Sequence, residues 1–413
     1  MKNLTLLLIS FFAILLFNTC KKEDSPAPKP PETTNVYNVT YTENTVVIDS
    51  LVAQSLVKID SADYRYYFES NDPSVTNLKE DDILLIYGTA LRRVTGVTRN
   101  GNETIVETSY ATLNEAIRDG EISWDKEISF NKGIIPEVQM AGKTIHYKTV
   151  TADGFEFEFT YGKYKYRIKF DFGDEKADVE LEITKDLVQP ISAKFLAKGS
   201  IQNFNTHTEM EFEDSKLKNF GQKNSDLSGD LTLNLTVAGS GNDGLTFDFP
   251  VVLLKYPVMV GPIPVIINLK VLFVINCVVP IDGSAQVEVK FTYNSTAGVK
   301  YNGTTVSADA NMGEPSIEKK ISQTGASSAI GVNFGLAFPR MEVGVFDEVI
   351  VPWVQTAFLI GGDYTFTPPC QQAKAQFIGA CGLDLSFLGF GYSANKTLWQ
   401  QEKVLLQSGD CPQ

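Results

Sequence analysis

The alternation of hydrophobic and polar positions is the strongest pattern in the chain, and residues 155–172 show it most clearly. Two alternating runs flank Gly162 and Lys163, and a two-residue loop with glycine first suits a type II′ hairpin turn. A slip of one residue would put aromatic rings opposite charges, so the register is well specified. We interpret the aromatic face as core, with a sugar-stacking platform as the alternative. The predicted pairs are Phe155–Phe170, Phe157–Ile168 and Phe159–Tyr166 on that face, and Glu156–Lys169 and Glu158–Arg167 on the other.

The segment 263–280 is a second, longer alternating run. Every odd position from Val265 to Val279 is apolar, whereas Asn268 and Lys270 occupy even positions. A period of two and the enrichment in β-branched residues predict a strand rather than a helix. At about 3.3 Å per residue this strand would reach roughly 40 Å, well beyond the usual length.

The same patterning divides the folded part of the chain into two predicted regions of a mainly β protein. Residues 141–413 are almost wholly strand-like and predict a large, elongated antiparallel β-sheet or sandwich. Residues 35–140 predict a smaller β-rich module with one short helix. The further alternating runs of the larger region are 286–293, 329–338, 357–366 and 383–394.

The predicted helix of the smaller module follows Thr112. Thr112 and Glu115 have the spacing of a capping box, in which each residue satisfies a backbone N–H of the first helical turn. Leu113 and Ile117 would share one helical face, and Gly120 would end the helix.

The chain begins with a pattern that is typical of secretion. Residues 1–19 contain an early lysine and then an apolar run of the length that a signal peptide needs. A membrane-spanning helix is the alternative, but it needs about 20 apolar residues. The run ends at Cys20, with Leu16 four positions before it and Thr19 immediately before it.

This arrangement resembles the lipobox of bacterial lipoproteins, in the looser form common in Bacteroidota. The resemblance implies that the Cys20 thiol is diacylated, that the chain is cut just before it, and that the new N-terminus is acylated as well. Two or three acyl chains anchor a protein stably, whereas a single chain holds it only marginally.

The residues after Cys20 extend the resemblance. Lys22, Glu23 and Asp24 resemble the export signal that sends Bacteroidota lipoproteins to the outer face of the outer membrane. The alternatives are a generic solvated tether and an anchor in the periplasmic leaflet. Residues 20–34 are rich in proline and predict a semi-rigid, lipidated tether that holds the body off the membrane.

Charge and cysteine content narrow the possible partners. The net charge of −14 argues against nucleic acid, which requires a basic face. Four cysteines remain besides Cys20, and an oxidising compartment favours disulfides among them. We favour Cys370 with Cys381, which would close a hairpin-sized loop, and keep either of them with Cys411 as the rival. The absence of a CxxC motif and the two histidines in the whole chain make a zinc site improbable.

Catalytic motifs are absent from the sequence. Neither His146 nor His207 lies near a GxSxG motif, and HExxH and P-loop patterns do not occur. The segment 239–247 resembles one copy of the calcium-binding nonapeptide of RTX proteins, with Asp243 at the ligand position. Those repeats bind calcium by stacking several copies, and a Gly/Asn/Asp hairpin turn explains the same residues.

We therefore expect a non-catalytic binding or adhesion module. It would be anchored in the outer membrane and would face the cell exterior. One alternative is a carrier for an apolar ligand such as a lipid in a β-lined tunnel, which the apolar excess of residues 245–280 favours. A second is a glycan-binding protein. The partner would be a surface protein, a glycan or a lipid, and no cofactor is expected apart from the weak calcium signal.

Overall fold

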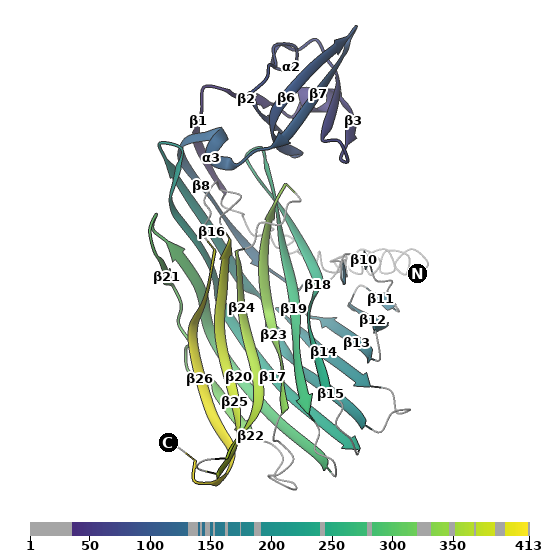
Figure 1. Cartoon of the computed structure of the whole chain (residues 1–413), viewed down its shortest axis with the longest axis vertical. Coiled ribbons are helices and arrows are strands. Elements are labelled where there is room, and N and C mark those ends of the chain that lie inside the picture. Colours follow the sequence, from purple (N-terminus) through teal and green to yellow (C-terminus); the bar gives the residue numbers. More distant parts are fainter. Residues whose placement is uncertain are drawn as a thin grey trace, which may run out of the picture. The chain divides into compact units, whose positions relative to one another are not determined.

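The computed structural model of the chain is mainly β, which confirms the predicted fold class (Figure 1). Contacts within the chain group residues 34–413 into one compact unit. The described residues form three β-sheets and two short α-helices, and none of these helices is long and apolar enough to cross a membrane. The structure describes residues 35–130, 139–140, 143–144, 149–151, 153–161, 164–173, 175–185, 191–239, 244–278, 283–319, 332–346, 352–366, 369–384 and 393–411.

The largest sheet has twelve strands (Figure 1). They are β1 (Asn35–Tyr41), β8 (Ile117–Ile128), β11 (Thr149–Thr151), β12 (Gly154–Tyr161), β13 (Tyr164–Phe172), β14 (Lys176–Lys185), β15 (Ile191–Gln202), β16 (Phe204–Glu213), β17 (Lys216–Gly239), β20 (Gly283–Tyr301), β21 (Val306–Ala308) and β22 (Ser316–Lys319). β20 pairs with β17 over most of its length, whereas β16 and β15 pair with successive parts of the other edge of β17. These parts meet at a bulge between Asn224 and Leu227, where Asp226 has a φ of 61°.

The second sheet has eight strands and contains the long strand predicted at residues 263–280. Its strands are β9 (Gln139–Met140), β10 (Lys143–Thr144), β18 (Gly244–Val260), β19 (Ile263–Val278), β23 (Val332–Val345), β24 (Trp353–Phe366), β25 (Pro369–Asp384) and β26 (Ser393–Gly409). The predicted strand is β19, which pairs antiparallel with β18 on one side and with β23 on the other. Its prediction as a strand is confirmed.

The two large sheets pack face to face around one hydrophobic core. Aromatic rings of the twelve-stranded sheet contact rings of the eight-stranded sheet, and each such pair contributes about 0.5–1.5 kcal/mol beyond the area that it buries. The ring centroids lie 6.0 Å apart for Phe170–Phe338, 5.8 Å for Phe195–Phe334 and 5.2 Å for Phe291–Phe358. The inner faces of both sheets therefore form the interior of the protein.

The register predicted for the hairpin of residues 155–172 is confirmed at all of its pairs. Its aromatic face belongs to the core, where Phe157 and Phe170 are fully buried, so the interpretation as core packing is confirmed as well. On the outer face, Arg167 binds Glu156 on β12 at 2.8 Å and Glu180 on β14 at 2.5 Å. Half-exposed ion pairs of this kind contribute at most about 1 kcal/mol each.

The third sheet has six strands and lies between β1 and β8 in the sequence. It consists of β2 (Thr45–Ile48), β3 (Leu56–Asp60), β4 (Arg65–Glu69), β5 (Ile83–Ile86), β6 (Ala90–Asn100) and β7 (Glu103–Tyr110), with the 3₁₀-helix η1 (Val52–Ser55) and the α-helix α2 (Pro73–Thr76) in its connections. Ile83 and Leu85 join the large core, whereas Leu84 and Ile86 join a separate small core. The small sheet therefore ends near residue 110, and the boundary predicted at residue 140 does not coincide with its end, because β1 and β8 belong to the twelve-stranded sheet.

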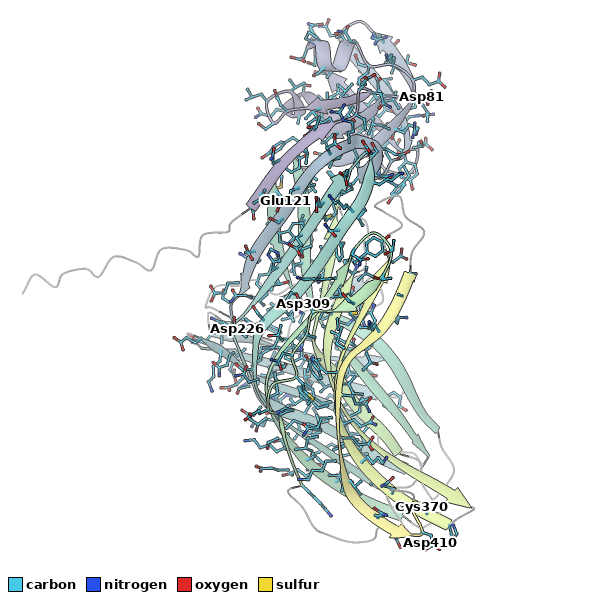
Figure 2. The ribbon with its side chains drawn as sticks, turned by 90° about the vertical axis from the view of Figure 1, so that its left-hand side faces the viewer. Asp81, Glu121, Asp226, Asp309, Cys370 and Asp410 are labelled. Carbon is cyan, nitrogen blue, oxygen red and sulfur yellow. A yellow bond between two sulfur atoms is a disulfide. The ribbon has the colours of Figure 1, made fainter. Side chains whose placement is uncertain are left out.

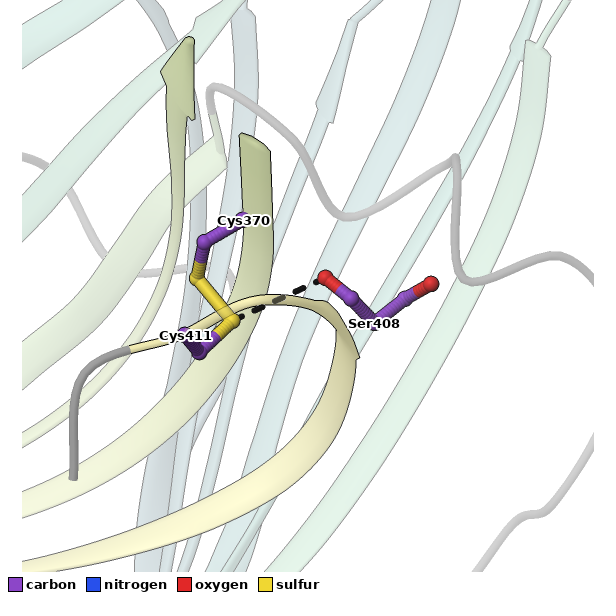
Figure 3. Close-up of a disulfide and its surroundings, with 3 residues drawn as sticks. All are labelled: Cys370, Ser408 and Cys411. Carbon is purple, nitrogen blue, oxygen red and sulfur yellow. Dashed lines mark hydrogen bonds between the residues drawn. A yellow bond between two sulfur atoms is a disulfide. The ribbon is translucent and has the colours of Figure 1, made fainter. Parts of the chain in front are cut away.

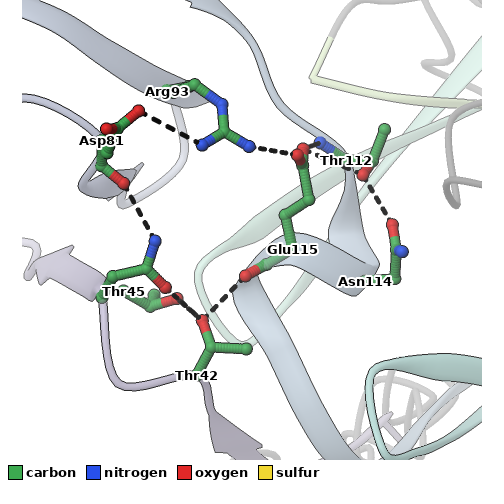
Figure 4. Close-up of polar contacts among 8 residues, drawn as sticks. Thr42, Thr45, Asp81, Arg93, Thr112, Asn114 and Glu115 are labelled. Atoms are coloured by element: carbon green, nitrogen blue, oxygen red, sulfur yellow. Dashed lines mark hydrogen bonds and ion pairs between the residues drawn. The ribbon is translucent and has the colours of Figure 1, made fainter.

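The capping box predicted at Thr112 is present, but the helix behind it is shorter than expected. The Thr112 backbone N–H donates to Glu115 Oε2 at 2.7 Å, and Arg93 donates to the other carboxylate oxygen (Figure 4). Helix α3 spans only Leu113–Ala116. The chain then enters β8, in which Gly120, at a φ of +138°, lies against the backbone of β1. Strand pairing with β1 and β16 has replaced the second helical turn.

Candidate functional site

Most of the residues that the sequence singles out lie outside the described residues. These residues are Cys20, Lys22, Glu23, Asp24, His146 and Asp243. The proposed acyl anchor, the export signal and the weak calcium position therefore stay predictions. Within the described ranges, no group of three or more His, Cys, Asp and Glu side chains is arranged to hold a metal ion.

The favoured disulfide was wrong, and the rival pairing is present (Figure 3). Cys370 is bonded to Cys411, and Cys381 is a free, buried cysteine. The prediction failed because the segment between Cys370 and Cys381 is not a loop. Both lie on the extended strand β25, where eleven residues separate their Cα atoms by roughly 36 Å, and a disulfide requires less than about 7 Å. The bond fixes the end of β26 beside Pro369, whose carbonyl accepts from the Asp410 N–H at 2.9 Å.

Cys381 faces the core and is not a reactive thiol. Burial raises the pKa of its thiol to about 11. Because the thiolate is the nucleophilic form, this cysteine is protonated and unreactive at neutral pH.

His207 lies on the outer face of β16 among carboxylates. Its Nδ1 lies 2.8 Å from Asp125 Oδ1, and its Nε2 lies 3.6 Å from Glu209 Oε2. Among the residues that the structure describes, this cluster contains no serine, threonine or cysteine that His207 could activate as a nucleophile.

An uncharged polar surface interrupts the apolar inner face of the twelve-stranded sheet. We call it the inner polar patch. It comes from four strands: β8, β16, β17 and β20. Its members are Trp124, Thr206, Thr208, Gln222, Asn224 and Ser295.

Strand register brings these side chains together. Thr208 pairs with Trp124 on one side and with Gln222 on the other. In the next inward-facing row, Thr206 pairs with Asn224. Ser295 completes the patch, because it is the inward-facing position of β20 next to Ala297, the partner of Asn224. Inward-facing positions on one strand alternate with outward-facing ones, so all of these side chains point into the interior.

The inner polar patch is buried, and the described part of the chain supplies no hydrogen-bond partner for its polar atoms. Its residues are between 1% and 4% exposed. The indole Nε1 of Trp124, the three hydroxyls and both polar atoms of each amide have no hydrogen-bond partner among the described residues. Most buried polar groups in native proteins are paired, and each one left unpaired costs about 1–3 kcal/mol. Six such residues side by side therefore require polar partners other than the described protein groups.

The eight-stranded sheet adds one further unpaired hydroxyl. Thr356 on β24 is fully buried, and its Oγ1 has no partner among the described residues. Its cross-strand neighbour Gly379 lies under the Trp399 ring. Trp399 Nε1 donates to Thr296 O, next to Ser295, at 3.2 Å. The side of the core that holds Ser295 therefore also holds Thr356.

Apolar side chains border the inner polar patch along the strands. The bordering residues of the core are Ile122, Met210, Phe220 and Tyr301 beyond one row, and Ile128, Phe204 and Leu227 beyond the other. Lys126 pairs with Thr206 and, by strand alternation, belongs to the inward-facing positions. It is half-buried, so a positive charge lies at the margin of the patch on β8.

The outer face of the same strands is polar in a different way. Figure 2 labels two of its exposed acidic residues, Glu121 on β8 and Asp226 on β17. An open groove of about 710 Å³ lies there, lined by residues that include Glu121, Glu211 and Lys300. Two of its charged residues have local partners: Lys300 pairs with Asp309, and Asn219 and Lys218 bind Glu211 and hold the pKa of its carboxyl below the usual range. The outer groove therefore has the paired polar groups of a solvated surface.

The inner polar patch was not predicted from the sequence, although the sequence contains a signal for it. In "FNTHTEMEF" (204–212), Thr206 and Thr208 occupy the positions that alternate in phase with Phe204, Met210 and Phe212. Polar residues in phase with a hydrophobic face predict either a register error or a functional interior. The positions of Gln222 and Asn224 repeat this signal on the next strand.

Comparison with known proteins adds no assignment to this geometry. The chain matches no known protein family, no curated protein and no solved structure. The fold and the inner polar patch define a class only: a mainly β protein whose two large sheets enclose a buried polar surface without hydrogen-bond partners among the described residues.

Proposed function

We propose that the protein is a membrane-anchored, non-catalytic binding protein that encloses its ligand between its two large sheets. One observation carries the proposal: the inner polar patch holds buried donors and acceptors without partners among the described residues. A ligand seated between the sheets would supply those partners. This function is the carrier alternative of the sequence analysis, with a polar recognition surface added to the apolar interior.

The chemistry of the patch favours binding over catalysis. Hydroxyl, amide and indole groups donate and accept hydrogen bonds, but none of them titrates near neutral pH as a general acid or base must. A surface built from these groups orients a ligand without offering it a proton or an activated nucleophile.

The proposed anchor places this binding body at the membrane. Acylated Cys20 and the proline-rich tether would hold the body a short distance from the lipid, and the Lys22–Asp24 signal would display it on the cell exterior. Protease added to intact cells should then remove the body, and full protection of the body in intact cells would contradict surface display.

Native mass spectrometry on residues 34–413, purified without detergent, tests the enclosed ligand. This fragment contains every described strand. We expect a discrete additional mass that organic solvent removes. A bare polypeptide mass, obtained under conditions that keep lipids bound to a reference carrier, would contradict the proposal.

The small sheet supports a second candidate function, adhesion to a protein surface. Its edge strand β3 exposes Val57 and Ile59 by 52% and 45%, and Leu51 before it is 75% exposed. Exposed apolar side chains on an edge strand favour pairing with another chain. Replacing both Val57 and Ile59 by lysine should abolish binding of the purified body to whole cells, and unchanged binding would exclude this edge.

A further inference from the structure

We infer that the enclosed ligand presents an uncharged, hydroxyl-rich unit, such as a sugar ring or a polyol, to the inner polar patch. This inference rests on the proposed function, since it names the chemical class of the ligand that the two sheets enclose. It is carried by the donor and acceptor content of the patch, by the position of Lys126 beside it, and by the size and border of the patch.

The patch offers donors and acceptors in mixed order. The Gln222 and Asn224 amides each carry two N–H donors and an acceptor oxygen. Each hydroxyl both donates and accepts a hydrogen bond, whereas Trp124 Nε1 only donates. A hydroxyl group also donates and accepts, so a hydroxyl-rich unit can satisfy every one of these atoms. A phosphate or carboxylate only accepts, so it would leave the amide oxygens without donors.

A charged side chain, Lys126, lies beside the patch. No member of the patch is charged, and Lys126, the cation on the adjoining inward-facing position, is half-buried at the β8 margin. Burying an ionised group away from water requires a close counter-charge. An anionic headgroup centred on Gln222 and Asn224 would be separated from Lys126 by strand β16, whereas a neutral unit needs no counter-charge.

The dimensions of the patch fit a small saccharide. Its hydroxyls and amides cover three neighbouring strands, β16, β17 and β20, and three inward-facing positions along them. With about 4.8 Å between strands and about 3.4 Å per residue, this area measures roughly 10 Å by 14 Å. Aromatic and aliphatic side chains border it, including Phe204 and Phe220, and they suit the apolar C–H faces of a sugar or the chain attached to it.

Two probes that share an alkyl chain and differ in headgroup test the inference. n-Octyl-β-D-glucoside carries a neutral hydroxyl-rich head, and octyl phosphate carries an anionic one. Each is added below its critical micelle concentration to residues 34–413, after solvent extraction of any bound material and refolding verified by circular dichroism. Binding is followed by native mass spectrometry and by isothermal titration calorimetry.

Matched variants locate the binding site. Asn224→Leu and the double change Thr206→Val with Thr208→Val remove polar atoms from the patch. Asn234→Leu and Thr232→Val are the controls, because they make the same changes at outward-facing positions of β17. The valine changes are nearly isosteric, so they keep the test valid if Asn224→Leu fails to fold.

We expect the glucoside to bind the wild-type protein and both controls, and to lose about tenfold or more in affinity in the patch variants, since each lost hydrogen bond to a buried group costs about 1–3 kcal/mol. Octyl phosphate should bind more weakly than the glucoside, and Lys126→Met should leave glucoside binding unchanged.

Three results would overturn the inference. If octyl phosphate binds at least as tightly as the glucoside and Lys126→Met abolishes its binding, the head is anionic and the proposed enclosed ligand survives alone. If the patch variants bind the glucoside as the wild type does, the patch is not its site. If neither probe binds and the protein purifies without a ligand, the inference and the proposed function both fail.

Discussion

At the residue scale, we predict how stability changes when an amide of the inner polar patch, which has no partner among the described residues, is removed. Replacing Asn224 by leucine removes two buried polar atoms that have no partner among the described residues. The free energy of unfolding of the ligand-free protein should therefore rise by about 1 kcal/mol. Urea unfolding of the wild type, Asn224→Leu and the outer control Asn234→Leu measures this change. A loss of stability in Asn224→Leu that exceeds the loss in the control would mean that the amide has partners in the folded protein.

The second prediction at this scale concerns Glu115 and the pH dependence of stability. Burial alone would raise the pKa of its carboxyl, but hydrogen bonds from Thr112 and the ion pair with Arg93 hold the pKa below the usual 4.5. Because the folded-state pKa is the lower one, the contribution of Glu115 to stability is complete above pH 4.5 and is lost as the pH falls through the folded-state value.

Glu115→Gln should remove that dependence. At pH 7 the variant should lose about 1 kcal/mol, the usual contribution of a cap, and the difference from the wild type should shrink toward pH 3. Urea unfolding at both pH values measures it. An equal difference at pH 7 and pH 3 would show that the charge of Glu115 does not stabilise the fold.

The sequence predicted some residues of this network and not others. The capping box could be predicted because Thr112 and Glu115 are three residues apart and interact locally (Figure 4). The contact of Glu115 with Arg93 could not, because β6 and α3 meet only in the folded chain. Polar residues in phase with apolar ones mark β16 and β17 separately, but the meeting of four strands in one inner polar patch could not be predicted, because only tertiary pairing brings them together.

At the element scale, the local sequence pattern predicts the register of the hairpin of β12 and β13. It does not predict which cysteines form the disulfide. The hairpin register follows from alternation and turn length, both of which are local. The disulfide depends on whether residues 371–380 turn back or continue as a strand. They continue, because β24 and β26 pair with them along both edges, and no local signal in the segment shows this.

The prediction at this scale concerns the contribution of the Cys370–Cys411 disulfide to stability. It closes a segment of 41 residues, and the chain-entropy account assigns about 4 kcal/mol to a loop of this length. Cys370→Ser and Cys411→Ser should each lower the free energy of unfolding by up to about that amount. Cys381→Ser should not show this loss, because Cys381 is not part of the bond. Chemical denaturation of the three variants measures the changes, and peptide mapping without reduction should recover Cys370 linked to Cys411. A linked Cys370–Cys381 peptide would contradict the pairing.

At the scale of the whole molecule, the sequence predicted a mainly β protein and could not predict its topology. Alternation gave the long strand β19 and the strand-rich region after residue 140. It did not show that the small sheet is inserted between β1 and β8, nor that β17 pairs with β20 across more than forty residues of intervening chain. Such pairings are decided by which faces fit together after folding, and the interior site depends on them.

The central claim is that the two large sheets enclose a ligand whose polar unit rests on the inner polar patch. Crystallographic electron density between the sheets of residues 34–413, purified without detergent, tests this claim most directly. We predict continuous density within hydrogen-bond distance of Thr206, Gln222 and Asn224 that neither the chain nor isolated waters account for. Density for separate water molecules alone, or patch side chains that bond one another and leave no space, would contradict the account.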